Sequence, residues 1–253
     1  MKIISINIEA NKHTETVMNF LKKENADVVC IQELLEDDFE LYKKELGLDG
    51  VFQPFDYCCR HINLKIIYDI PLDLKGKKHG VAIFAKNIVK SDSIFYEGHK
   101  ENIIKPFDEY TSNEKFQKNK TLIWAEVKDD DGIIFKFVTT QLPVTHEGEV
   151  TPYQLEVINL MLSHLKNLGE FVFCGDTNAS RGAESFALIA EKYKDNIPLE
   201  YKTSIDQNLH RTKGLQYMVD GLFTTPTNKA SNVRLQDGIS DHMAVIADIE
   251  KII

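Results

Sequence analysis

Residues 171–181 read Phe-Val-Phe-Cys-Gly-Asp-Thr-Asn-Ala-Ser-Arg. The four apolar residues 171–174 have the length and type of a buried strand, and Gly175 is expected to end it. Asp176 and Asn178 follow. Because side chains alternate with a period of two in an extended chain, these two are expected to share one face at the exit of the strand. A carboxylate and a carboxamide there indicate a functional site, and an Asx turn, in which both bond their own backbone, is the structural alternative.

Polar residues also follow two strands expected near the amino terminus. Residues 2–8 form the first strand, which carries Asn7 near its end, and a helix over 14–24 separates it from a second strand over 26–31. Glu33 comes just after that second strand. Two strands joined by one helix favour a parallel pair, so Asn7 and Glu33 should emerge at the same edge. Glu33 is then a candidate metal ligand, whereas Asn7 is either a ligand or a turn residue.

The remaining elements follow from apolar periodicity and turn residues. Helices are expected over 36–46, closed by Gly47, over 152–168 after the N-cap Thr151, and over 183–193. Strands are expected over 81–85, near Ser93, and over 121–128, 133–140, 218–225 and 243–249, with a solvated hairpin turn at 129–132. Residues 58–63 read as a loop, and residues 87–120 as a strand followed by a long surface excursion. No Gly/Ser/Pro-rich linker interrupts the chain, which predicts a single domain over 1–253.

Composition limits the classes of partner. The formal net charge of −9 disfavours sequence-independent binding to DNA or RNA, since a polyanion is repelled at long range. No apolar run reaches the roughly 18 residues that a transmembrane helix needs, and the amino terminus lacks the pattern of a signal peptide. The four cysteines lack zinc-site spacing and are expected to be free thiols. These observations predict a cytoplasmic protein.

Five segments therefore carry polar residues at expected strand ends: Asn7, Glu33, Asp176 with Asn178, Asp220 in Met-Val-Asp-Gly-Leu-Phe, and Asp241 with His242 in Ile-Ser-Asp-His-Met-Ala. In this order and spacing the chain resembles the endonuclease/exonuclease/phosphatase superfamily, which includes pancreatic-type deoxyribonuclease, exonuclease III-type nucleases, neutral sphingomyelinases and inositol-polyphosphate 5-phosphatases. The resemblance runs from residue 3 to residue 249, and its most specific pieces are 175–178 and 240–242. It implies an α/β fold in which two β-sheets form a sandwich with flanking helices, with the site at one edge.

The resemblance also implies three groups of site residues: the metal ligands Glu33, Asn7 and Asp241; Asp176 and Asn178, which orient the attacking water and a phosphoryl oxygen; and His242, a base or phosphate partner held by Asp220. Mg²⁺ is a hard ion that prefers such oxygen ligands, and Mn²⁺ is the expected substitute. An imidazole fixed by a carboxylate suits a base near neutral pH, and the alternative for His242 is a histidine satisfied in the core.

The chain departs from the family at Gln141, where phosphodiesterase and phosphatase members commonly carry a histidine. A glutamine can donate a hydrogen bond to a phosphoryl oxygen but cannot protonate a leaving group. His146, five residues on, is either a relocated acid or a surface residue. Arg181, His210 and Arg211 are candidate phosphate-binding residues, with solvated loop positions as the alternative.

These observations predict a Mg²⁺-dependent phosphodiesterase or phosphatase that acts on a small or lipid-derived phosphoester. Two alternatives stay open. One is a nuclease that acts on DNA or RNA through a local basic surface. The other is a binding or scaffold protein that retains the fold without turnover, for which Gln141 is the support in the sequence.

Overall fold

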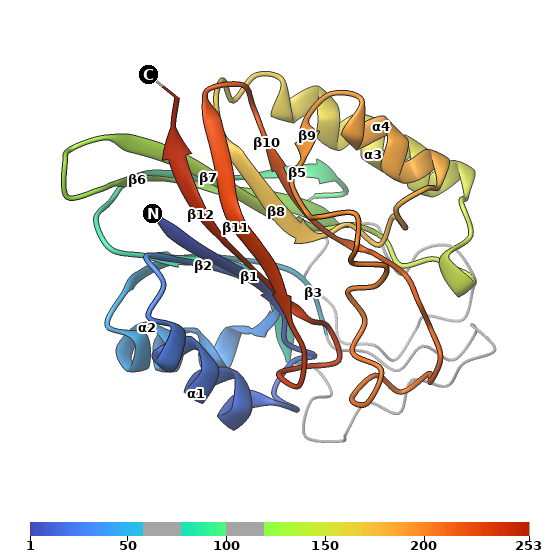
Figure 1. The fold of residues 1–253 in the computed structure, drawn as a ribbon, viewed down its shortest axis with the longest axis horizontal. Coiled ribbons are helices and arrows are strands. Elements are labelled where there is room, and N and C mark those ends of the chain that lie inside the picture. The colour runs from blue at the N-terminus through green and yellow to red at the C-terminus, as the bar shows by residue number, and fades with distance from the viewer. Residues whose placement is uncertain (58–76, 100–118, 253) are drawn as a thin grey trace.

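Two β-sheets pack face to face, and helices cover their outer faces (Figure 1). The computed structural model describes residues 1–57, 77–99 and 119–252. The α/β two-sheet sandwich expected from the sequence is confirmed. The expected loop at 58–63, with Cys58 and Cys59, and most of the expected surface excursion lie outside the described residues.

The strands and helices have the following bounds. The first sheet contains β1 (Lys2–Asn7), β2 (Val28–Leu35), β3 (Asp49–Tyr57), β4 (Lys78–Ala85), β11 (Asn228–Gln236) and β12 (Ala244–Lys251). The second contains β5 (Ile88–Glu97), β6 (Lys120–Lys128), β7 (Ile134–Gln141), β8 (Val172–Asp176), β9 (Lys194–Asp195) and β10 (Asp220–Thr224). The helices are α1 (Thr14–Glu24), α2 (Phe39–Leu46), α3 (Pro152–Leu165) and α4 (Glu184–Ala190), with 3₁₀ turns η1 (Glu36–Asp38) and η4 (His146–Gly148).

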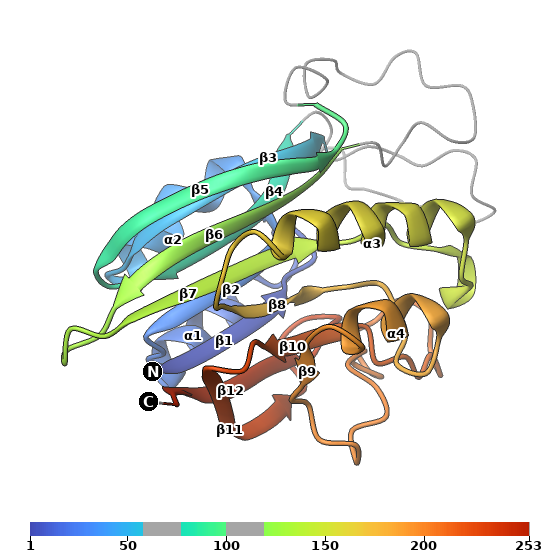
Figure 2. The same ribbon diagram turned by 90° about the horizontal axis from the view of Figure 1, so that it is seen from above.

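The apolar residues form three layers that follow this architecture. One cluster lies between the sheets, a second under α1 and α2, and a third under α3 and α4, in agreement with the two views of the ribbon (Figures 1 and 2). Cys30 of β2 and Cys174 of β8 belong to the central layer and are free, buried thiols, as expected for these two residues. Each sheet is therefore apolar on both faces, which explains why its central strands read as continuous apolar runs.

Two parallel strand pairs bring the polar strand ends together. The strand order is β11-β12-β1-β2-β4-β3 in the first sheet and β5-β6-β7-β8-β10-β9 in the second. The strands β1 and β2 are parallel, with Asn7 opposite Gln32, and β7 and β8 are parallel, with Gln141 opposite Asp176. Helices α1 and α3 supply the two crossover connections. The prediction that Asn7 and Glu33 emerge at one edge is confirmed.

Several predictions from turn and cap chemistry are also confirmed. The hydroxyl of Thr151 accepts a hydrogen bond from the Gln154 amide at 3.1 Å and caps α3, whose first residue is a proline. Gly47 ends α2 in the left-handed conformation. The β6–β7 hairpin forms, and its turn is closed by the Ile133 amide, which donates to the Asp129 carboxylate at 2.7 Å.

The structure differs from the sequence-based expectation mainly at sheet edges. Strands β3 and β11 occupy the two edges of the first sheet, and neither was expected. An edge strand needs fewer apolar residues than a central one, and β11 carries a bulge between Ser231 and Arg234, so its alternation is broken. The expected helix over 36–46 begins with the 3₁₀ turn η1, and α4 ends at Ala190, before the expected residue 193.

Gly175 lies inside β8, which corrects the expectation that it ends the strand. It pairs with Thr140 of β7 and Gly221 of β10, and its φ is 150°. A Cβ at this position would lie 2.2 Å from the carbonyl oxygen of Thr140. The glycine therefore allows β7 and β8 to approach one residue before Asp176.

We predict that Gly175→Ala lowers the free energy of unfolding by about 3 kcal/mol, because the added methyl must push β7 away from β8. Gly169→Ala is the matched control. Gly169 also has a positive φ, 73°, but a Cβ there meets no atom within 4 Å. Its cost should be about 1 kcal/mol, from backbone strain alone. Urea denaturation measures both, and equal losses would contradict the steric explanation.

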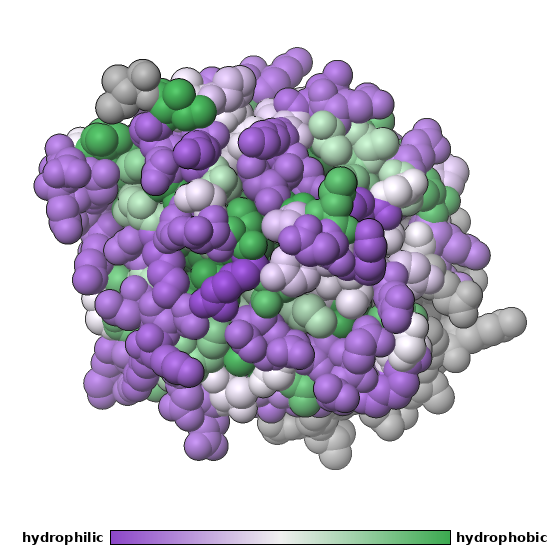
Figure 3. Space-filling model, in the orientation of Figure 1, coloured by the Kyte–Doolittle hydropathy of each residue, from purple (hydrophilic) through white to green (hydrophobic). Residues whose placement is uncertain are grey.

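The outer surface is mainly polar. Hydrophilic side chains cover most of the face seen in Figure 3, and apolar side chains gather there only in small patches between them. Within the described ranges, no helix is long and apolar enough to cross a bilayer.

Candidate active site

Two rows of polar side chains face each other at one edge of the sandwich. In the second sheet, Lys120, Gln141, Asp176 and Asp220 lie at the same end of the consecutive strands β6, β7, β8 and β10. In the first sheet, Asn7 and Glu33 lie at the ends of β1 and β2, beside His79 of β4, and Asp241 and His242 precede β12. The sequence-based prediction placed all of these except Lys120 and His79 at the site.

A bulge in β2 directs Glu33 toward the site. The register between β2 and β4 shifts between Gln32 and Leu34, and Glu33 has a left-handed backbone with φ of 61°. Both neighbours are fully buried, whereas Glu33 is partly exposed. One extra residue in a strand turns its side chain out of the alternating pattern, so the carboxylate can project from the edge without disturbing the core.

Two carboxamides join the carboxylates of the two rows. The Nδ2 atom of Asn7 donates to Glu33 Oε1 at 3.0 Å and to Asp176 Oδ2 at 3.1 Å. The Nε2 atom of Gln141 donates to the same two oxygens, at 2.6 and 3.3 Å. Reversing either amide would set an oxygen against two carboxylates, so the orientation of both groups is determined.

These donors also affect the acidity of Glu33. Burial raises the pKa of this carboxyl, but the nearby charge of His79 and the hydrogen bonds from Asn7 and Gln141 outweigh it. The pKa of Glu33 is therefore lowered, and the group is held as a carboxylate. A carboxylate that is ionised, partly exposed and fixed by two donors is suited to bind a cation.

Asp176 and Asn178 form an Asx turn that also belongs to the site. The backbone amide of Asn178 donates to Asp176 Oδ1 at 3.0 Å, and its side-chain amide donates to Asp176 Oδ2 at 3.1 Å and to the Leu142 carbonyl at 2.9 Å. Asn178 has a φ of 45°, so the turn, and not the period of a strand, brings the two side chains together. Burial, together with the charges of Asp220 and Glu33, raises the pKa of Asp176 to about 6, against the opposing effect of His242.

The side chains of His242 and Asp220 form a buried pair. The ring Nδ1 and the Asp220 Oδ2 are 2.8 Å apart. Burial by itself disfavours the charged ring, but the carboxylates of Asp220 and Asp176 and the hydrogen bond that the ring donates to Asp220 raise the pKa of His242 well above its usual value. Asp220 thus fixes the ring orientation and leaves Nε2 as the atom available for chemistry.

Oxygen atoms dominate the donor set around this edge, which fits a hard divalent cation. Two groupings are present. Asp176, Asp220 and His242 have potential ligand atoms within 4.8 Å of one another. The expected ligands Glu33 and Asn7 are hydrogen-bonded to each other, and the neighbouring Asp241 has its pKa raised by burial and by the charges of Glu9 and Glu33, against the effect of His242.

The candidate phosphate-binding residues are not all near this edge. The guanidinium of Arg181 binds the Asp195 carboxylate at 2.7 Å and the Ile197 carbonyl at 2.9 Å, so its expected contact with substrate is not supported. His210 is buried, and its charge acts on Asp241, which places it beside the site. His146 is exposed on η4, and no hydrogen bond or ion pair joins its side chain to the described site residues.

Arg211 adjoins His210 in sequence and is exposed. Sequence reasoning missed Lys120 and His79. Lys120 is 6% exposed, and its Nζ lies 5.0 Å from the centre of the Phe55 ring. Burial lowers the pKa of Lys120, and the carboxylates of Asp56, Asp176 and Glu33 act in the opposite direction. The sequence signal that could have indicated Lys120 was its position directly before the apolar residues of a strand.

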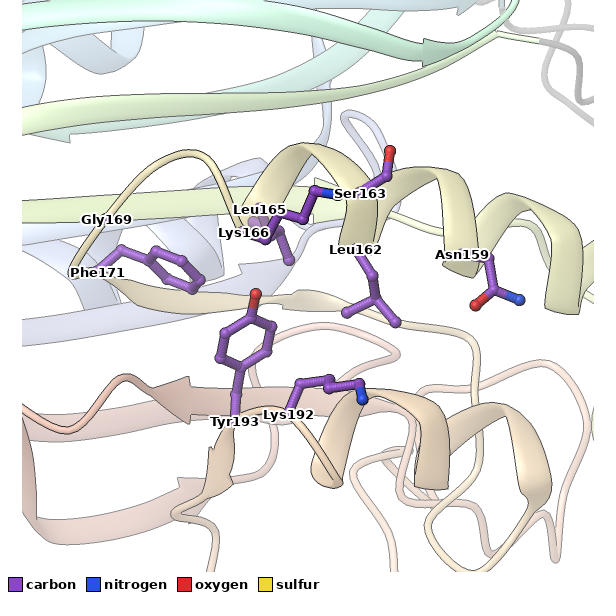
Figure 4. Close-up of a pocket in the computed structure, with 9 residues that line it drawn as sticks. All are labelled: Asn159, Leu162, Ser163, Leu165, Lys166, Gly169, Phe171, Lys192 and Tyr193. Carbon is purple, nitrogen blue, oxygen red and sulfur yellow. The ribbon is translucent and has the colours of Figure 1, made fainter.

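A separate pocket of about 480 Å³ lies between α3 and the end of α4 (Figure 4). Leu162, Leu165 and Phe171 form part of its apolar lining, and Lys166 and Lys192 part of its polar lining. None of the site residues described above borders it, so this pocket has no part in the chemistry of the sandwich edge.

Residues 4–242 match the model of the Endonuclease/Exonuclease/phosphatase family. The chain belongs to this family. A search among curated protein sequences finds no significant match. The match over nearly all of the described strands and helices agrees with the site geometry, since the family motif residues expected from the sequence meet at one edge.

Solved structures show the same fold. A family member from Bacteroides vulgatus has a TM-score of 0.70 at 18% identity, with 99% of this chain and 98% of that chain covered. The mannosyl-6-phosphatase Bt3783 of Bacteroides thetaiotaomicron has a TM-score of 0.67 at 14% identity, with 99% of each chain covered. The human Nocturnin catalytic domain, with a bound sulfate, has a TM-score of 0.70 at 16% identity, with 100% of this chain and 93% of that chain covered. At these sequence identities, the similarity to the solved structures shows a shared fold and nothing further.

The acidity of Asp176 predicts how the stability of the metal-free protein depends on pH. Its pKa is about 6 in the folded protein against an ordinary 3.8, so the folded protein binds this proton more tightly than the unfolded chain. The resulting stability is fully present below the lower value and is lost as the pH rises through the higher one, by on the order of 3 kcal/mol in total.

Asp176→Asn should remove this dependence. In urea denaturation with EDTA, the stability of Asp176→Asn relative to wild type is expected to rise by on the order of 2 kcal/mol between about pH 4.5 and pH 7.5. Asp130→Asn, in the exposed hairpin turn, is the control and should run parallel to wild type. Parallel curves for Asp176→Asn would show that its proton is not held by the fold.

Proposed function

We propose that the protein is a metal-dependent hydrolase of phosphoesters. The observation that carries the proposal is the pairing of Glu33 with Asp176 across the two sheets, next to the Asp220–His242 pair. Carboxylates that converge repel one another, and a bound divalent cation relieves that repulsion. An imidazole held by a carboxylate supplies the second requirement of hydrolysis, a group that handles the proton of the attacking water.

The proposed metal ligands are Glu33, Asp241 and Asn7, with Mg²⁺ as the ion and Mn²⁺ as its substitute. Glu33 is favoured because it is ionised and partly exposed, whereas Asp220 is already used to orient His242. The Oδ1 atom of Asn7 accepts the Glu9 amide at 3.1 Å and keeps a second lone pair. A bound divalent ion neutralises phosphoryl charge in this class of reaction.

The remaining residues act on the water and the phosphoryl group. In this proposal Asp176, fixed by the Asn178 backbone, orients the attacking water. The Asn178 side chain binds a phosphoryl oxygen by exchanging one of its two amide contacts, to the Leu142 carbonyl or to Asp176, for the substrate. His242 either accepts the proton of the water at Nε2 or donates from Nε2 to the phosphoryl group. In both cases the Asp220 carboxylate stabilises the imidazolium, because it lies 2.8 Å from Nδ1.

We propose a small or lipid-derived substrate and a cytoplasmic location. The net charge of −9 repels extended polyanions at long range, which a small ester does not feel to the same extent. The Bacteroides thetaiotaomicron structure is named a mannosyl-6-phosphatase, so the fold accommodates a phosphatase of that kind. Cleavage of DNA or RNA is the second candidate, since the family includes nucleases by its description.

Turnover of p-nitrophenyl phosphate and bis-p-nitrophenyl phosphate with Mg²⁺ or Mn²⁺ tests the proposal and separates a monoesterase from a diesterase. Glu33→Gln is expected to lose about 10²-fold or more of the rate, because even residues outside the ligand shell cost up to that factor at metal sites. Glu36→Gln is the matched control, since Glu36 is exposed and pairs with Lys78 at 3.3 Å.

One outcome of this panel would overturn the proposed activity, and a second assay tests the proposed substrate class. Measurable Mg²⁺ binding without turnover of either ester would favour a scaffold protein that keeps the fold. Efficient nicking of plasmid DNA at low salt, abolished by Glu33→Gln, would establish the nuclease.

The contacts of Gln141 predict how the hydrolysis rate depends on the leaving group. Both hydrogens of its amide point to carboxylates, at 2.6 and 3.3 Å, so it has no donor left for a departing oxygen. We predict that Gln141→His raises the rate on alkyl phosphoesters by up to about 10²-fold and changes nitrophenyl esters little, since a weakly basic leaving oxygen needs no acid.

His146→Ala tests the other candidate for the acid. Because His146 is exposed on η4, the ratio of alkyl to nitrophenyl rates is expected to be unchanged. A selective loss of alkyl turnover would instead identify His146 as the relocated acid.

A further inference from the structure

Lys120 is a buried cation without an ion-pair partner in the described part of the chain. It is 6% exposed, and its Nζ lies over the Phe55 ring, 5.0 Å from the ring centre. No carboxylate of the described residues lies within ion-pair distance, although Asp176, Glu33 and Asp56 act on its charge. An ammonium held in this way has lost water and gained few hydrogen bonds, which indicates a ligand that accepts from it.

The strand order places Lys120 at one end of a line of site residues. The second sheet presents Lys120, Gln141, Asp176 and Asp220 on β6, β7, β8 and β10 in that spatial order. His242 is bonded to Asp220, at the opposite end from Lys120. The proton-handling group and the unpaired ammonium are therefore separated by the carboxylate and the amide that lie between them.

In phosphoryl transfer, the His242 end and the Lys120 end of this row would have different roles. The attacking and leaving oxygens lie roughly in line on opposite sides of phosphorus. If the water is handled at the His242 end, the leaving oxygen departs toward the Lys120 end. Gln141 lies between them, but its amide hydrogens are already used by Glu33 and Asp176. Lys120 is then the nearest described donor in this row for the charge that develops on the leaving oxygen.

We infer that the Lys120 ammonium donates a hydrogen bond to the leaving oxygen of the substrate and stabilises its negative charge. This inference rests on the proposed phosphoester hydrolysis. In the step, the water oxygen forms a new bond to phosphorus, and the proton of the water passes to Nε2 of an unprotonated His242 ring. The bond between phosphorus and the leaving oxygen breaks, its electron pair stays on that oxygen, and the alkoxide takes a proton from solvent. His242 returns its proton to solvent, and Lys120 stays protonated throughout.

This role predicts a dependence on the leaving group that a general phosphate-binding role does not. A donor aimed at the leaving oxygen matters most when that oxygen is strongly basic, whereas a donor to a non-bridging oxygen affects all esters alike. The slope of log kcat/KM against the basicity of the leaving group therefore separates the two roles.

The test compares wild type with Lys120→Met on p-nitrophenyl, phenyl and benzyl esters of the phosphate class that the wild type hydrolyses. Lys120→Met is expected to lose about 10²-fold on the benzyl ester and little on the p-nitrophenyl ester, because removing one donor to a developing charge costs about that factor. The loss should appear in kcat more than in KM. Lys120→Arg keeps the charge and should keep the shallow slope.

Lys136→Met is the matched control. Lys136 also lies over an aromatic ring, with Nζ 4.9 Å from the centre of Trp124, but it pairs with Glu126 on the β6–β7 hairpin away from the site. Its slope should equal that of wild type. Thermal unfolding of each variant checks the fold, and Lys120→Met should be no less stable than wild type, since it removes a buried charge.

Each of three results would overturn the inference. An equal loss on all three esters would assign Lys120 to phosphate binding. The second is no loss on any of the esters, and the third is a Lys120→Met protein that does not fold, together with a steep slope for Lys120→Arg. Absence of turnover in the wild type with every ester and both metals would instead refute the proposed function.

Discussion

The whole site depends on one cross-link between the two sheets. Glu33 belongs to the first sheet and Asp176 to the second, and the amide groups of Asn7 and Gln141 each donate to both carboxylates. Two like charges in a partly buried edge repel each other, and shared donors reduce that repulsion at the distance a site requires. The cross-link therefore joins the two sheets at this edge and helps to keep the Glu33 carboxylate ionised, so that it can bind a cation.

The parallel strand pairs explain why this convergence could be predicted from the sequence. Asn7 ends β1, and Glu33 lies two residues before the end of β2, which α1 joins to β1; Gln141 and Asp176 end strands joined by α3. A right-handed crossover returns the chain in the same direction, so polar residues at the carboxyl ends of such strands must share an edge. The sequence pattern of an apolar run, a helix and a second apolar run is a local signal. It was sufficient to predict this part of the fold and most of the site.

Local signals do not report contacts made across the sandwich. Lys120 looked like a polar residue before a strand, because nothing near it in sequence indicates that the strand places it beside Phe55 and the carboxylates. Arg181 follows the central motif and was expected to bind phosphate, yet a short strand that the sequence did not predict supplies Asp195 to bind it. Edge strands and buried charges depend on distant partners, which a reading of one chain segment at a time cannot supply.

Glu33 enters the first sheet as an insertion. The ladder between β2 and β4 is interrupted at this residue and resumes at Leu34, and the left-handed backbone of Glu33 is unfavourable for a residue with a side chain. The sheet would be more regular without it, so the fold does not require the carboxylate that the proposed chemistry needs. In evolutionary terms, a descendant of this chain can lose its cation and its turnover through one deletion while it keeps a folded sandwich. Such silent members are an expected by-product of a site built on a bulge.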